Sequence, residues 1–120
     1  MKQIDDDRYE VVKGEKITLV CTPFGIPPEV ITASLDDGPI DPDPASPNPT
    51  YTFDASVPTD QTHFFKIECD FVNAPDTAKT VIAITGEKDG NVTGPFSVSI
   101  LKTDNIHDPT FRFKVVKPAS

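Results

Sequence analysis

The sequence predicts an all-β domain, an antiparallel two-sheet sandwich of about seven or eight strands. Two observations carry this prediction. Apolar residues alternate with polar ones over several short segments, as they do in strands with one buried face. Turn-forming residues separate these segments, and no segment has the apolar period of a helix.

The stretch from His63 to Val72 has the clearest alternation. Apolar residues occupy every second position, at Phe65, Ile67, Cys69 and Phe71, and charged residues lie between them. A second stretch, Lys16 to Thr22, repeats the pattern with Ile17, Leu19 and Cys21. We expect these two strands to face each other across the apolar interior, with both cysteines inside.

The other strands are expected in chain order over 8–13, 29–35, 51–55, 79–85, 96–102 and 110–117. The 79–85 run is apolar on both faces, which predicts a central strand. A connection over 86–94 contains Asp89-Gly90, a pair that type I′ hairpin turns favour. In the last strand, outward Arg112 and Lys114 indicate an edge protected by charge or open to a partner strand.

Residues 38–50 form a proline-rich segment with five prolines in thirteen positions. Proline removes backbone donors and favours extended conformations, so we expect a stiff crossover loop on the surface. Such a loop is either a spacer between the sheets or a presented binding segment. Residues 1–7 are expected to be disordered.

Length and charge limit the classes of function. A chain of 120 residues corresponds to one domain, here 1–120. The net charge is -8, and the first 60 residues hold 12 acidic and 4 basic side chains. Such a chain repels nucleic acid and anionic membranes, and it has no apolar run long enough for membrane insertion. We therefore expect protein partners or neighbouring domains of the same polypeptide.

The start of the sequence, MKQIDDDRYE, lacks the apolar middle of a signal peptide. The chain is then either cytosolic or a segment of a longer product whose leader is replaced. We favour the second interpretation, which predicts an extracellular, periplasmic or cell-surface location.

Cys21 and Cys69 are both expected in the core. A bridge between them would remove about 4 kcal/mol of unfolded-chain entropy, and the alternative is two reduced, buried thiols. Neither has a second cysteine or a histidine at metal-ligand spacing.

With these two strands, KITLVCT and FKIECDF, the chain resembles an immunoglobulin-like domain. The resemblance implies an Ig-like or related Greek-key topology and a Cys21–Cys69 disulfide across the sandwich. The chain lacks tryptophan, and Ile67 stands where such domains carry the tyrosine of the corner. The segment Asn48-Pro49-Thr50 is similar to the NPT loop of chagasin-type inhibitors of cysteine proteases, which implies a protease-inhibitor function.

Catalytic and metal-binding motifs are scarce. The two histidines, His63 and His107, have no motif around them and are expected at solvated strand ends or loops, so we predict no enzyme. Calcium, which binds carboxylates on loops, is the one cofactor that the sequence suggests. Its predicted ligands are Asp36, Asp37, Asp41 and Asp43.

These observations predict a non-catalytic binding, adhesive or spacer module of a secreted or cell-surface protein. Alternatives are a carbohydrate-binding accessory domain of an enzyme, a calcium-binding sandwich and the inhibitor named above. Carbohydrate-binding surfaces use exposed aromatic rings. This chain has no tryptophan, and we expect both of its tyrosines, Tyr9 and Tyr51, to point into the core.

Overall fold

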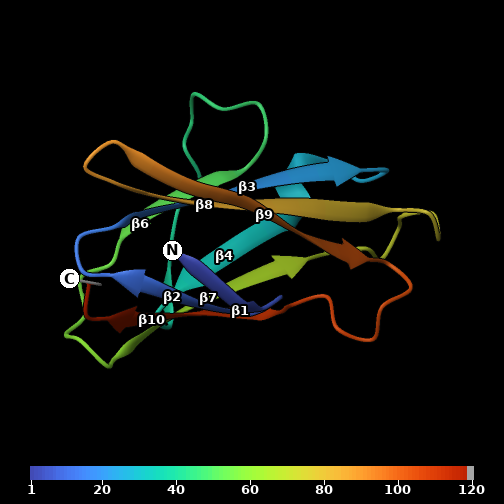
Figure 1. The fold of residues 1–120 in the computed structure, drawn as a ribbon. Coiled ribbons are helices and arrows are strands. Elements are labelled where there is room, and N and C mark those ends of the chain that lie inside the picture. The colour runs from blue at the N-terminus through green and yellow to red at the C-terminus, as the bar shows by residue number, and fades with distance from the viewer. Residues whose placement is uncertain (119–120) are drawn as a thin grey trace.

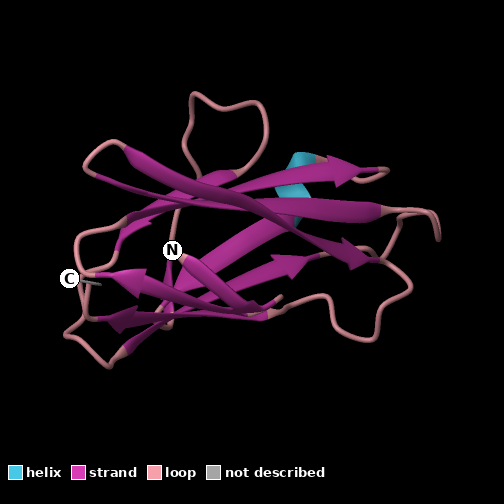
Figure 2. Cartoon of the chain, viewed as in Figure 1, coloured by secondary structure: helices cyan, strands magenta, loops and turns pink. Residues whose placement is uncertain are grey.

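A computed structural model of the protein describes residues 1–118 and shows two layers of strands with one short 3-10 turn, η1 (Pro28–Val30) (Figures 1 and 2). The six-stranded sheet has the order β1 (Lys2–Asp5), β2 (Arg8–Val12), β10 (Thr110–Val116), β7 (Thr62–Cys69), β4 (Ile31–Leu35), β5 (Gly38–Pro39). The four-stranded sheet has the order β6 (Thr50–Asp54), β3 (Lys16–Phe24), β8 (Lys79–Lys88), β9 (Asn91–Leu101). The predicted all-β, two-sheet class is confirmed.

The core lies between the sheets and follows the alternation of the strands. The two central strands, β3 and β7, lie in different sheets, as predicted, and turn Leu19 and Ile67 completely inward. Aromatic rings fill the space between them, with the Phe53 ring centroid 5.7 Å from that of Phe65 and 5.4 Å from that of Phe113. Such tilted and offset contacts add to the burial of the rings.

The N-terminal segment corrects the sequence prediction. Residues 2–5 are not disordered, because β1 pairs antiparallel with β2 across a two-residue turn. The Tyr9 hydroxyl donates to the Asp6 carbonyl oxygen at 2.9 Å and fixes this turn. A short, polar strand that pairs through its backbone leaves little hydrophobic pattern in the sequence.

The last strand is also placed differently from the prediction. β10 is not an edge, because it pairs parallel with β2 and antiparallel with β7. Arg112 and Lys114 point to solvent from the outer face of an interior strand. Buried apolar and exposed charged residues alternate in the same way in an edge strand and in an inner strand with one solvent-exposed face, so the sequence does not distinguish the two.

The β8–β9 hairpin is longer than predicted. Strand structure continues to Lys88 and resumes at Asn91, so the connection is only Asp89 and Gly90, with φ of 53° and 81°. Positive φ at both positions defines the expected type I′ turn. The central position predicted for 79–85 is confirmed, since β8 lies between β3 and β9.

Gly86 of β8 lies against a buried ion pair. The ammonium group of Met1 lies 2.9 Å from Glu15 Oε2, and both groups are enclosed. A Cβ at position 86 would lie 2.3 Å from that carboxylate oxygen, so only glycine leaves room for the pair. Glu15 Oε1 also accepts from the backbone N–H of Val12 at 3.1 Å.

Candidate functional site

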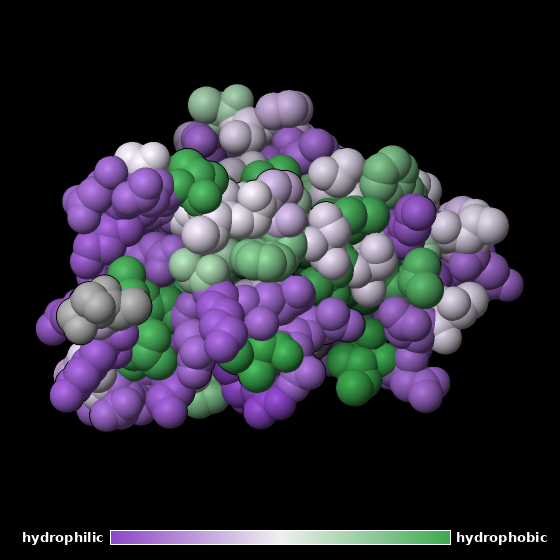
Figure 3. Space-filling view, in the orientation of Figure 1, coloured by the Kyte–Doolittle hydropathy of each residue, from purple (hydrophilic) through white to green (hydrophobic). Residues whose placement is uncertain are grey.

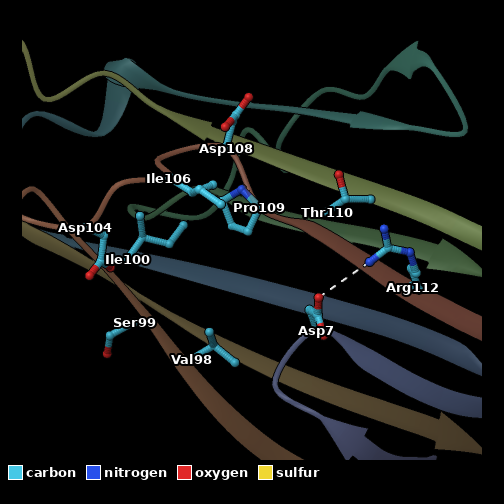
Figure 4. Close-up of a pocket in the computed structure, with 10 residues that line it drawn as sticks. All are labelled: Asp7, Val98, Ser99, Ile100, Asp104, Ile106, Asp108, Pro109, Thr110 and Arg112. Atoms are coloured by element: carbon cyan, nitrogen blue, oxygen red, sulfur yellow. Dashed lines mark hydrogen bonds and ion pairs between the residues drawn. The ribbon is translucent and has the colours of Figure 1, made fainter.

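A groove of about 500 Å³ runs between β9 and the start of β10 (Figure 4). Its floor is apolar and comes from β9, through Val98 and Ile100, and from the 102–109 loop, through Ile106 and Pro109. Ile106 is 63% exposed, so an aliphatic side chain of the loop is open to solvent beside the groove. The groove is therefore a surface site at which apolar side chains remain accessible.

Carboxylates outnumber cations around this groove. Asp7, Asp104 and Asp108 line it, together with the single cation Arg112. Arg112 Nη1 lies 3.5 Å from Asp7 Oδ2, the contact drawn in Figure 4. The site is consequently acidic at its margin and apolar at its floor.

The backbone of β9 forms one side of the site. β9 is the last strand of its sheet and has no neighbour on its outer side within residues 1–118. Lys102 N donates to Ala78 O at 3.0 Å, and the register with β8 is regular from Leu101 back to Phe96. Backbone groups alternate in direction along an antiparallel strand, so those of Ser97 and Ser99 face the open edge.

β9 also lacks the usual protection of an edge strand. Its eleven residues include no charged side chain. In the space-filling view the band across the upper middle, where β9 runs, is white to green, whereas purple with scattered green patches predominates below it (Figure 3). Edge strands of soluble proteins are commonly blocked by charge, and this one is not.

His63 lies inside the protein, and the prediction that it is solvated is wrong. Its side chain is 3% exposed, and its Nε2 accepts the backbone N–H groups of Ser56 at 3.0 Å and Val57 at 3.3 Å. Its Nδ1 therefore carries the proton and donates to Asp36 Oδ2 at 2.7 Å. Both ring nitrogens are occupied, so the ring serves as a structural link between three segments. The alternation that points Phe65 inward does the same at position 63.

The second histidine is a loop residue held by the backbone. His107 Nε2 donates to the Lys102 carbonyl oxygen at 2.8 Å, and its ring stacks edge-on against Phe71 at 4.8 Å. The contacts order the 102–109 loop that carries Ile106. Neither histidine pairs with a serine or cysteine side chain among residues 1–118.

The predicted Cys21–Cys69 disulfide is not formed, and both thiols are free and buried. Burial raises the pKa of Cys21 to about 12, with a smaller contribution from nearby Cys69. The Cys69 thiol donates to Thr80 Oγ1 at 3.7 Å, and burial raises its pKa too. Protonated thiols are poor nucleophiles, so these residues act as small core side chains.

The four aspartates predicted to bind calcium are not gathered into a site. Asp36 accepts from His63 and, through Oδ1, from the Phe64 N–H at 2.8 Å. Asp43 Oδ1 accepts from the Ala45 N–H at 2.9 Å within its own loop. Among residues 1–118 no group of three or more metal-ligating side chains is positioned around a common point.

The segment Asn48-Pro49-Thr50 lies where the proline-rich loop, which projects at the top of Figure 1, returns to β6. Pro49 is buried, and its carbonyl oxygen accepts from the Cys21 N–H at 2.8 Å. Asp43 N donates to Thr50 O at 2.8 Å. The segment is thus anchored in the sheet, and the exposed residues of the loop are Pro39, residues 41–45 and Pro47.

Comparison of the chain with protein-family models, curated proteins and solved structures gives no match. Within residues 1–118 no helix has the length and apolar character needed to cross a bilayer.

Proposed function

We propose that this chain is a non-catalytic protein-binding module and that its binding site is the groove beside β9. The observation that carries the proposal is an eleven-residue, uncharged edge strand bordering an apolar groove. Accessible apolar surface beside unpaired backbone is the combination by which strands recognise other proteins. The buried, fully bonded His63 and the protonated thiols support a role without chemistry.

The fold class supports a finer assignment as an immunoglobulin-like module. Cys21 and Cys69 project into one core from strands of opposite sheets, and an N-terminal strand runs parallel to the last strand. The β8–β9 hairpin, inserted before β10 in the opposite sheet, distinguishes this chain from the antibody-type arrangement. Sandwiches of this class occur widely in cell-surface proteins, which supports a secreted or surface location.

A carbohydrate-binding role has less support. Tyr9 and Tyr51 are each 1% exposed, so the exposed aromatic rings are those of Phe24 and Phe64. Phenylalanine has no polar group to bond a sugar hydroxyl.

The test is affinity capture from the source organism with the intact protein immobilised. Three baits are compared: wild type, Ile106→Asp in the groove, and Thr32→Asp on the exposed face of β4 as the matched control. We expect one protein to be captured by wild type and Thr32→Asp and lost with Ile106→Asp. The same dependence must hold when that protein is purified and its Kd is measured. Equal capture by all three baits would refute the proposed site.

A further inference from the structure

We propose that the groove receives an extended, basic segment of a partner protein, which adds a fifth strand to the four-stranded sheet along β9. This inference rests on the binding function proposed above. It specifies how the partner binds and which chemistry it carries.

The backbone of β9 offers a defined docking length. Pro95 has no N–H, and the β8–β9 register shifts between Ile84 and Gly86, so the regular part of the strand begins at Phe96. At the other end, the Leu101 N–H is already bound by Asp104 Oδ2 at 2.9 Å. Between these points the open-edge groups of Ser97 and Ser99 are directed to solvent, and a strand docked there would bond to them.

The side chains of an added strand would alternate between two environments. Those on the inner side would extend the layer formed by Val98 and Ile100 and would cover Ile106 and Pro109 in the groove. Those on the outer side would continue the row of Ser97 and Ser99, which is exposed. The structure therefore calls for aliphatic residues at alternate positions of the segment.

Charge selects among the segments that could pair. Asp104 makes no ion pair among residues 1–118, Asp108 lies 3.6 Å from Lys66 Nζ, and Asp7 pairs with Arg112. Three aspartates thus line the groove in a chain of net charge -8, and one of them, Asp104, has no cation partner among residues 1–118. A second copy would bring its own uncharged β9, whereas a lysine- or arginine-rich strand would complement this margin.

The probe is a synthetic nine-residue peptide of alternating lysine and valine, added to the ¹⁵N-labelled full chain. Its control is a peptide of alternating glutamate and valine. We expect the lysine peptide to shift amide signals over 96–101 and 104–109, and to bind about ten-fold more tightly than the glutamate peptide.

Two pairs of variants separate backbone pairing from charge. Ser99→Pro removes one outward N–H, whereas Ser99→Ala keeps it. We expect the proline variant to lose about ten-fold in affinity and the alanine variant to bind as wild type. Ser97→Pro makes the same test if Ser99→Pro does not fold. Asp104→Asn combined with Asp108→Asn should weaken binding about five-fold, and 0.5 M salt should have a similar effect.

Three results would overturn the inference. They are equal binding of both peptides, shifts centred away from β9, and unchanged affinity of a folded proline variant. Concentration-dependent dimerisation abolished by Ser99→Pro would instead make a second copy the occupant. If the peptides fail but Ile106→Asp still prevents capture of a purified partner, the binding function stands and only the strand-addition mode is refuted.

Discussion

The four-stranded sheet has two edges, β6 and β9, which differ in length, in charge and in what lies beside them. β6 has five residues, ends in Asp54, and is approached by the proline-rich loop, whose Asp43 N–H binds Thr50 O. β9 has eleven uncharged residues and no neighbour on its outer side within residues 1–118. Unprotected edges invite pairing with another chain, which is the physical basis of the binding site proposed for β9.

The six-stranded sheet supports the same conclusion. Its edge strand β5 has two residues, and β1 has four, with a register shift and charged side chains at Lys2 and Asp5. Short length, irregular register and charge are the known ways of blocking an edge. Only β9, among the four edges in residues 1–118, shows none of these over its regular part from Phe96 to Leu101.

The largest expected effect is on the free energy of unfolding, when a substitution in the buried core is compared with one on the open edge of β9. Ile67→Ala removes a fully buried side chain from β7 and should lower the free energy of unfolding by about 2–5 kcal/mol. Ser99→Pro on β9 should change it by about 0.5 kcal/mol or less, because the lost N–H bonds only water. Urea unfolding followed by circular dichroism measures both. A proline variant as unstable as Ile67→Ala would mean that β9 is not a free edge.

The link at His63 should give the next largest effect. His63→Ala leaves two backbone N–H groups and the Asp36 carboxylate without their partner, at a cost of about 2–3 kcal/mol. The control is His107→Ala, which removes one hydrogen bond and a ring contact with Phe71 in a loop and should cost about 1 kcal/mol. Thermal unfolding compares the two variants. Equal losses would show that the enclosed link is no stronger than a loop contact.

A smaller effect, on peptide affinity, is expected when β9 is given a charged side chain like those that protect β1 and β6. Ser99→Lys places a cation on the outer face of β9 and should weaken binding of the lysine–valine peptide about three-fold without loss of stability. Ser99→Glu at the same position should strengthen it by a similar factor. Isothermal titration calorimetry provides the Kd values. Identical changes for both substitutions would indicate that size, and not charge, determines docking.

The smallest effect is expected from calcium. Asp36 already accepts two hydrogen bonds, and the acidic residues of 36–43 do not surround a common point. Addition of 5 mM Ca²⁺ should therefore move the Tm by about 1 °C or less. A larger rise that is abolished by Asp41→Ala together with Asp43→Ala would restore the calcium site and shift attention to the proline-rich loop.

Alternation in the sequence was sufficient to predict the class of fold and the core. Residues such as Leu19 and Ile67 show the period of a half-buried strand directly. The same alternation extends to His63, but an imidazole at the start of a strand is expected in solvent, so the sequence does not reveal its burial. Its partner Asp36 lies 27 positions away in another turn, and no local pattern reveals such a contact.

The proposed binding site is harder to predict because it depends on which strands are neighbours. The run FSVSIL around Val98 resembles any strand with one buried face, and only the sheet order shows that it is an edge. Conversely, Arg112 and Lys114 suggested an edge where the chain has an inner strand. The residues that line the groove lie far apart in the sequence, from Asp7 to Arg112. Its acidic margin therefore becomes visible only in the tertiary structure.

Amide hydrogen exchange tests the open edge most directly. In the free protein, the amides of Val98 and Ile100 should exchange slowly and those of Ser97 and Ser99 rapidly, a period of two along β9. The lysine–valine peptide should slow exchange at the two serines and leave the isoleucine and valine amides unchanged. Uniformly slow exchange in the free protein, or no protection of the serines by a bound peptide, would contradict the account.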